Sequence, residues 1–211
     1  MRIVTGSWIF TGLLLAGCTT YTARVNNAPG APTFYEDPGT PGKVKGIGIE
    51  SQDVAGMTDR MARDMLRDPR LAGAATPPHV IVDAKFFTNE GSSRINKNML
   101  CDRLRVLLNR AANGRMTFIG RHYANMVELE RGLKRSGTVS PGTRPARDAS
   151  GGGDYRLGGR ISTLDAVDAQ NGMASRFHQI VYEMVDLEGG EIVWSGIYDF
   201  KKTAQDDVIY R

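Results

Sequence analysis

The chain has 211 residues, a formal net charge of +4 and a hydrophobic fraction of 41%. This length favours one domain with room for a proper hydrophobic core, and the composition is typical of soluble globular proteins. The basic excess is too small to indicate a nucleic-acid partner. The 2 cysteines are too few to staple a domain if one of them is modified.

Residues 1–17 have the pattern of a secretory signal peptide. A positive start at Arg2 precedes an apolar run over residues 8–16, which is shorter than the roughly 20 apolar residues of a membrane-spanning helix. The run ends in Leu15-Ala16-Gly17-Cys18, which resembles the lipobox of bacterial lipoproteins. The alternative is an ordinary signal peptide followed by a chance cysteine.

The lipobox resemblance implies cleavage after Gly17 and acylation of Cys18 on its sulfur and on the new amine. Acyl chains contribute about 0.8 kcal/mol per buried CH₂, so several chains form a lasting anchor. The next residue is Thr19, not the aspartate that retains such lipoproteins at the inner membrane. We therefore expect a protein that is lipid-anchored to the outer membrane on its periplasmic side, where nucleic acid is not a partner.

Residues 18–42 are rich in proline and glycine and poor in apolar residues, which predicts a semi-extended tether that reaches about 75 Å when fully extended. A single domain should follow over residues 43–202, with a short tail over residues 203–211. In the domain, Ser51 is expected to cap a helix that ends near Asp68-Pro69. Its apolar stripe contains Val54, Met57, Met61 and Met65. Such a stripe favours a place in the core, and an adaptable Met-rich binding face is the alternative.

Residues 79–87 are rich in β-branched and aromatic side chains and predict one strand, and residues 117–119 predict a short one. The buried side of a second helix is expected to carry Ile95, Met99, Leu100, Leu104, Leu107, Leu108 and Ala111. Cys101 borders that stripe and should be a small packed side chain. A third helix should begin near Tyr123 and end before Gly137.

Residues 136–153 are rich in glycine, proline and arginine and predict a mobile loop or a weak helix. Alternation then predicts a strand over residues 155–161, a connection over residues 163–175, and two strands over residues 177–187 and 192–200. Two glycines at positions 189 and 190 predict a hairpin between the last two. The order indicates an α+β domain, with helices on a mixed, mainly antiparallel sheet and a C-terminal β-meander.

Catalytic and metal-binding motifs are absent from the sequence. Its 3 histidines lack a second ligand at metal-binding spacing, and no serine lies in a G-x-S-x-G motif. The glycines at 151–153 precede a strand, whereas phosphate-binding loops follow one. We expect no catalytic residue, metal, cofactor or small-molecule substrate, although an enzyme with a dispersed site remains an alternative.

Four stretches resemble the LpoB family of outer-membrane lipoproteins, which activate bifunctional penicillin-binding proteins. They span residues 52–66, 89–105, 153–162 and 185–194, and they include Asp102-Arg103-Leu104-Arg105 and Gly153-Asp154-Tyr155-Arg156-Leu157-Gly158-Gly159-Arg160. The resemblance implies docking on the regulatory module of the synthase and no catalysis. The chain departs from the family in its short tether and in its loop over residues 136–153.

The surface expected to bind the partner is a rim of polar, glycine-containing loops, because binding residues concentrate on loops. Its candidate residues are Lys134, Arg135, Arg144, Arg147, Asp165 and Asp168. A structural or secretion-associated lipoprotein related to curli-type pores is the alternative function. A pore subunit would need membrane hairpins of alternating polarity with about 10 residues per strand, and residues 136–153 lack that alternation.

Overall fold

The computed structural model describes residues 33–43, 46–140, 142 and 151–205. The chain divides into a unit of residues 1–35 and a compact unit of residues 36–211, and all helices and strands given below belong to the second unit. The predicted signal peptide with Cys18, most of the predicted tether, and the candidate residues Arg144 and Arg147 lie outside the described residues.

The elements follow one another as α1 (Ser51–Met65), α2 (Pro69–Ala72), β1 (His79–Ile81), β2 (Phe87–Asn89), α3 (Lys97–Ala111), β3 (Thr117–Phe118), η1 (Arg121–Tyr123), α4 (Ala124–Arg135), β4 (Tyr155–Asp168), β5 (Met173–Asp186) and β6 (Ile192–Gln205). The 6-stranded sheet has the order β3-β1-β4-β5-β6, and β2 also pairs with β4. The short strands pair in parallel, whereas β4, β5 and β6 form long antiparallel ladders. The predicted α+β fold with a mixed, mainly antiparallel sheet and a C-terminal meander is confirmed.

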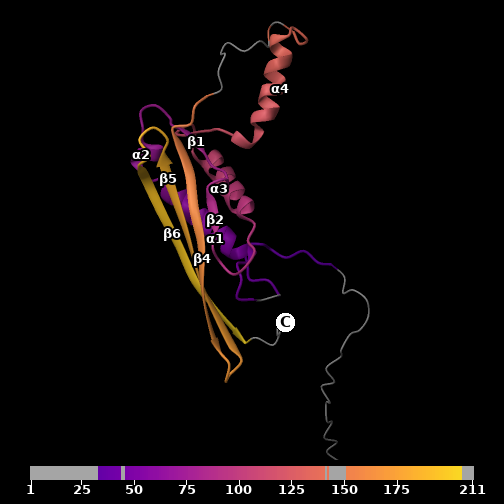
Figure 1. Ribbon diagram of the computed structural model, residues 1–211, viewed down its shortest axis with the longest axis vertical. Coiled ribbons are helices and arrows are strands. Elements are labelled where there is room, and N and C mark those ends of the chain that lie inside the picture. Colours follow the sequence, from indigo (N-terminus) through magenta and orange to yellow (C-terminus); the bar gives the residue numbers. More distant parts are fainter. Residues whose placement is uncertain (1–32, 44–45, 141, 143–150, 206–211) are drawn as a thin grey trace, which may run out of the picture. The chain divides into compact units, whose positions relative to one another are not determined.

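Helices α1 and α3 pack against one face of the sheet (Figure 1). The methionine stripe of α1 lies in the core, since Met57, Met61 and Met65 are at most 2% exposed. The stripe is therefore core and not an adaptable binding face. The expected cap at Ser51 is wrong by one residue, because Glu50 and Asp53 form a reciprocal capping box at the start of α1.

The strand expected over residues 79–87 is two strands. β1 ends at Ile81 and β2 begins at Phe87, and both pair in parallel with β4. Between them the chain leaves the ladder, and the Asp83 carboxylate accepts a hydrogen bond of 2.7 Å from Arg156 Nη2. Apolar residues continue through this break, so their pattern did not reveal it.

The strands β4 and β5 are longer than expected. The segment predicted as a connection over residues 163–175 is mostly strand, with only a turn at residues 169–172 between β4 and β5. We call the three long antiparallel strands β4, β5 and β6 the ribbon. Side chains at the β4–β5 turn end of the ribbon are largely solvated, for example Leu164 at 71% and Val167 at 76% exposure. Because the outer part of the ribbon buries little against the core, its sequence lacks the alternation that marks a half-buried strand. The predicted β5–β6 hairpin is confirmed, and Gly190 supplies its positive φ of 79°.

Candidate partner-docking surfaces

Asp165, one of the predicted binding residues, links β4 to β5 through an ion pair with Arg176. The register places it opposite Arg176, whose Nε and Nη2 donate to its carboxylate over 2.5 and 2.9 Å. Ser92 Oγ donates to the same carboxylate over 3.1 Å. The hydrogen bond from Arg176 lowers the pKa of Asp165 below its ordinary value. This side chain fixes the ribbon to the segment that follows β2.

Asp168, the second predicted carboxylate, organises the β4–β5 turn. It accepts hydrogen bonds from the backbone N–H groups of Gln170 and Asn171 over 3.1 and 3.3 Å, and from Asn171 Nδ2 over 2.8 Å. The hydrogen bond from the Asn171 side chain lowers the pKa of Asp168. Both carboxylates therefore have a structural role at this end of the ribbon, because their hydrogen bonds go to neighbouring residues of the strands, of the turn and of the segment that follows β2.

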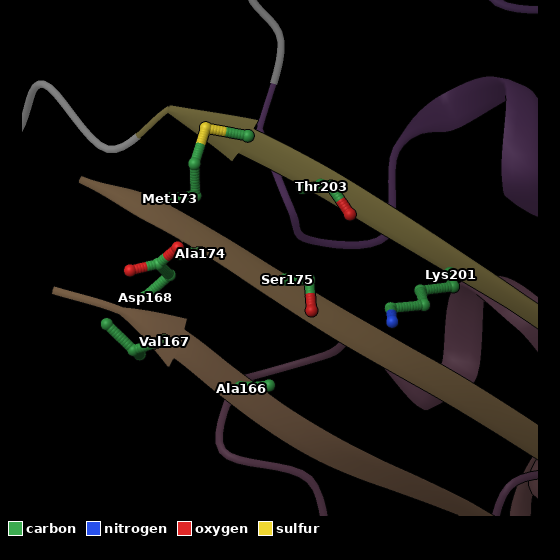
Figure 2. A pocket seen from close by; sticks show the side chains of 8 residues that line it. All are labelled: Ala166, Val167, Asp168, Met173, Ala174, Ser175, Lys201 and Thr203. Carbon is green, nitrogen blue, oxygen red and sulfur yellow. The ribbon is translucent and has the colours of Figure 1, made fainter. Parts of the chain in front are cut away.

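A shallow hollow of about 310 Å³ lies beside this turn. Figure 2 shows that its walls come from β4, β5 and β6, with Ser175, Lys201 and Thr203 among the labelled side chains. The remaining lining residues are Ala166, Val167, Asp168, Met173 and Ala174. We call this end of the ribbon, with the exposed Leu164 and Val167, the ribbon tip. The tip offers both apolar contacts and polar groups to a partner.

The basic candidates occur at the end of α4. Lys134 Nζ lies 3.7 Å from Glu130 one turn earlier, and Arg135 is the last residue of the helix. Lys134 and Arg135 lie at the end of α4, whereas Asp165 and Asp168 lie in the last part of β4. The rim as a binding surface stays a prediction.

Helix α4 has no buried residue. Met126, Leu129 and Leu133 are 61%, 73% and 45% exposed, and their spacing of three and then four residues places them on one face. We call these three residues the α4 ridge. The sequence marks them as apolar positions of a helix, but it does not show that the helix leaves them solvated.

A groove of about 1140 Å³ runs between α1 and α3. Sequence reasoning missed it, because it placed Met99 on the buried side of α3, whereas Met99 is 50% exposed. Ala111 is exposed as well, while Leu100, Leu104 and Leu108 are fully buried as expected. The buried stripe of α3 is thus narrower than the apolar one, and Met99 and Val106 border the groove.

Titratable groups with large pKa shifts lie in the core and not at these surfaces. Cys101 is 1% exposed, and burial raises its pKa to about 12. Tyr182 is fully buried, its pKa is raised by burial, and its hydroxyl donates to the Met57 sulfur. Within the described ranges, no group of three or more His, Cys, Asp and Glu side chains is placed to hold a metal ion.

Among the described helices, none is both long and apolar enough to cross a membrane. The family model named peptidoglycan-synthase activator LpoB matches residues 53–200. The chain belongs to this family. Comparison with curated protein sequences gives no match. The chain is thus a regulatory activator of peptidoglycan synthesis, and the resemblance of the four sequence stretches is confirmed.

Three solved structures are similar to this chain. The C-terminal domains of LpoB from Salmonella enterica and Escherichia coli are each 20% identical to it, with TM-scores of 0.39 and 0.40, and each match covers 70% of this chain and 98% of the other. Lipoprotein GNA1162 from Neisseria meningitidis is 11% identical, with a TM-score of 0.32, over 61% of this chain and 85% of the other. The family match over residues 53–200 carries the functional conclusion.

Proposed function

We propose that the mature protein is anchored in the outer membrane through acylated Cys18 and binds the regulatory module of a bifunctional penicillin-binding protein. Binding raises the glycan-polymerising and cross-linking rates of that synthase. The observation that carries the proposal is the family match over residues 53–200, downstream of a lipobox at residues 15–18.

An activator changes rate by binding the active conformation of its partner more tightly than the inactive one. Each factor of ten in that preference corresponds to about 1.4 kcal/mol of differential binding energy. A modest docking surface can supply this amount, because a fully buried Leu or Val side chain contributes about 1.5–3 kcal/mol.

We further propose that the protein itself catalyses neither reaction. A catalytic group must reach the substrate, and strongly shifted pKa values often mark such groups. Here Cys101 and Tyr182 carry the largest shifts and are 1% and 0% exposed. Burial in the core explains the pKa shifts of both groups. This supports a binding role for the protein.

The ribbon tip is the surface that we propose for docking. Leu164 and Val167 stand 71% and 76% exposed on a ribbon that the Asp165–Arg176 pair holds in place. Exposed apolar side chains on a braced scaffold lose little conformational freedom on binding. In this arrangement Asp165 and Asp168 hold the ribbon tip in shape, and Leu164 and Val167 contact the partner.

The test measures the affinity of residues 19–211 for the purified regulatory module of the cognate synthase. Leu164→Ser should weaken binding about tenfold, as loss of one buried leucine implies. Leu187→Ser is the matched control, because Leu187 is 46% exposed beyond the opposite end of β5. Absence of binding by the folded wild-type domain contradicts the function. Equal affinity of wild type and Leu164→Ser contradicts only the location.

A further inference from the structure

Strand β6 forms a free edge of the sheet. It runs over 14 residues from Ile192 to Gln205 and stands last in the strand order, with β5 as its described neighbour. Figure 1 shows it along the outer side of the ribbon. In an antiparallel pair only alternate residues bond to the neighbouring strand, so every second residue of β6 directs its N–H and C=O groups away from β5. Such a row of backbone groups is a template for a further strand.

The β6 edge has little of the protection that edge strands usually carry. Short length, prolines and β-bulges prevent pairing with another chain, but residues 192–205 contain no proline, and their register with β5 shifts only beside Val185, near the hairpin. An inward-pointing charge also protects an edge. Lys202 points toward α1, where its Nζ lies 2.5 Å from Asp53 and 3.3 Å from Glu50. The charge of Lys202 is therefore compensated within its own chain.

Two opposite charges on the other face of β6 are not compensated in this way. Asp199 and Lys201 are both exposed, and their spacing of two residues places them on the same face of the strand. In β5 they lie opposite Gln179 and Phe177, which carry no charge. Among the described residues, neither has an ion-pair partner. Both charges are therefore available to a strand that pairs with the β6 edge.

A second copy of β6 supplies the two missing charges. When two copies pair antiparallel with Phe200 opposite Phe200, Asp199 of each copy lies opposite Lys201 of the other. A shift by two residues in one direction places Asp199 opposite Asp199, and in the other direction it places Lys201 opposite Lys201. A shift by one residue sets the open face of one sheet against the core face of the other. Because opposite charges across two strands stabilise their pairing and like charges oppose it, the charges select the first register.

We propose that two copies of the domain pair through their β6 edges in this antiparallel register and form one continuous sheet. The contact is twofold symmetric, so it closes as a dimer and leaves neither β6 edge open. On the open face, Ile197 of each copy, which is 47% exposed, lies opposite Thr203 of the other. The ribbon tip residues Leu164 and Val167 are on β4, two strands from the β6 edge, so they remain uncovered. The proposal goes beyond the proposed function and does not depend on the synthase.

The first test is disulfide cross-linking of the full-length protein in cells. Two differently tagged copies are produced together, one with Ile197→Cys and the other with Thr203→Cys. Directly opposite residues have Cβ atoms about 4.5–5.5 Å apart, close to the separation in a disulfide. The described native cysteine, Cys101, is buried and does not compete. The proposal predicts a disulfide-linked dimer that carries both tags.

Each cysteine variant produced alone is the matched control. In the proposed register the two copies of residue 197 lie six positions apart along the strands, about 20 Å at roughly 3.3 Å per residue, so neither variant alone should form a dimer. Dimers from one variant alone, at the yield of the mixed pair, mean that the copies meet in another register and overturn the proposal. Cross-links only to another protein, or none at all, mean that a second copy does not occupy the β6 edge.

The second test is sedimentation of residues 19–211, which retain the whole compact unit of residues 36–211. Lys201→Asp and Asp199→Lys should each weaken self-association about tenfold or more, because each places like charges opposite one another at two positions. Circular dichroism checks that both variants are folded.

The equimolar mixture of the two charge variants gives the sharper result. One chain then carries two aspartates and the other two lysines at positions 199 and 201, so every charge in a mixed dimer faces its opposite, and the mixture should regain a dimer. A contact elsewhere on the domain would not be restored in this way. A wild-type chain that stays monomeric up to the highest soluble concentration, or a mixture that regains nothing, contradicts the pairing of the β6 edges.

Discussion

His178 Nε2 donates a hydrogen bond of 2.7 Å to the backbone oxygen of Ile47, so a side chain in β5 holds the segment that leads into α1. The imidazole is fully buried and stacks on Phe200 with ring centroids 4.7 Å apart. Its Nδ1 has no hydrogen-bond partner among the described residues. Protonation would place an unpaired donor and a charge in this site.

The stability of the domain should therefore fall as the solution becomes acidic. Burial lowers the pKa of His178 below 6.5, and the nearby Arg176 and Lys202 lower it further. The hydrogen bond to Ile47 and the charge of Asp53 oppose this shift without cancelling it. Between the folded-state pKa and about 6.5, the unfolded chain binds more protons than the folded one, so the free energy of unfolding decreases as pH falls through this window. Urea unfolding at pH 7.5 and at pH 5 measures the effect.

His178→Phe is the matched control for this pH dependence. It keeps a ring against Phe200 but removes the titrating group, so the part of the pH dependence due to His178 should vanish. At pH 7.5 the variant should lose about 1 kcal/mol, the contribution of one hydrogen bond. An unchanged pH dependence in the variant would show that other groups cause it.

Gly159 should tolerate no side chain. A Cβ at this position would overlap the Phe87 ring and lie 2.5 Å from the Val181 oxygen. Gly159→Ala should therefore lower the free energy of unfolding by about 1–3 kcal/mol, the usual cost of overpacking. At Gly158 the nearest atom to such a Cβ is the Phe86 oxygen at 3.5 Å, so Gly158→Ala should change stability by less than about 0.5 kcal/mol. Equal effects of the two substitutions would refute this packing.

Cys101 should be an inert thiol in the native domain. It is 1% exposed, and its raised pKa of about 12 keeps it protonated at neutral pH, whereas the reactive form is the thiolate. A bulky thiol reagent should label it only as fast as the domain opens, and urea should accelerate the labelling. Rapid stoichiometric labelling of the folded protein is the contrary result.

Cys18 should determine where the protein resides. Cys18→Ala removes the sulfur that the lipobox presents for acylation, so the chain should remain uncleaved or become soluble and unacylated. Cell fractionation and metabolic labelling with palmitate measure both effects. Recovery of the unlabelled variant in the outer membrane would contradict the proposed anchor.

Much of the fold could be predicted from apolar residues spaced so that they lie on one face of a helix or strand. The spacing of Met57, Met61 and Met65 predicts the buried side of α1, and the glycines at 189 and 190 predict the hairpin. The prediction for Met99 is wrong because the sequence shows that a helix position is apolar, but not whether another element covers that side of the helix. The outer parts of β4 and β5 were missed because ladder hydrogen bonds form there without burial, and hydrogen bonds leave no pattern in side-chain polarity.

The candidate surfaces were less predictable than the fold. Asp165 was identified as a polar residue, but its role as a brace depends on the β4–β5 register that places Arg176 opposite it. The contact between His178 and Ile47 joins residues 131 positions apart, and no local pattern reports such a pair. Family resemblance supplied the function, because a docking surface has no fixed spacing of chemical groups.

The most direct test of the central claim adds purified residues 19–211 to the cognate bifunctional synthase and follows glycan polymerisation and peptide cross-linking separately. We predict that the rates rise and saturate with the concentration of the added domain, and that the domain alone shows neither reaction. Leu164→Ser should shift the half-saturating concentration upward about tenfold and leave the plateau unchanged. If neither rate changes at saturating concentrations of the folded domain, the protein is not an activator of that synthase.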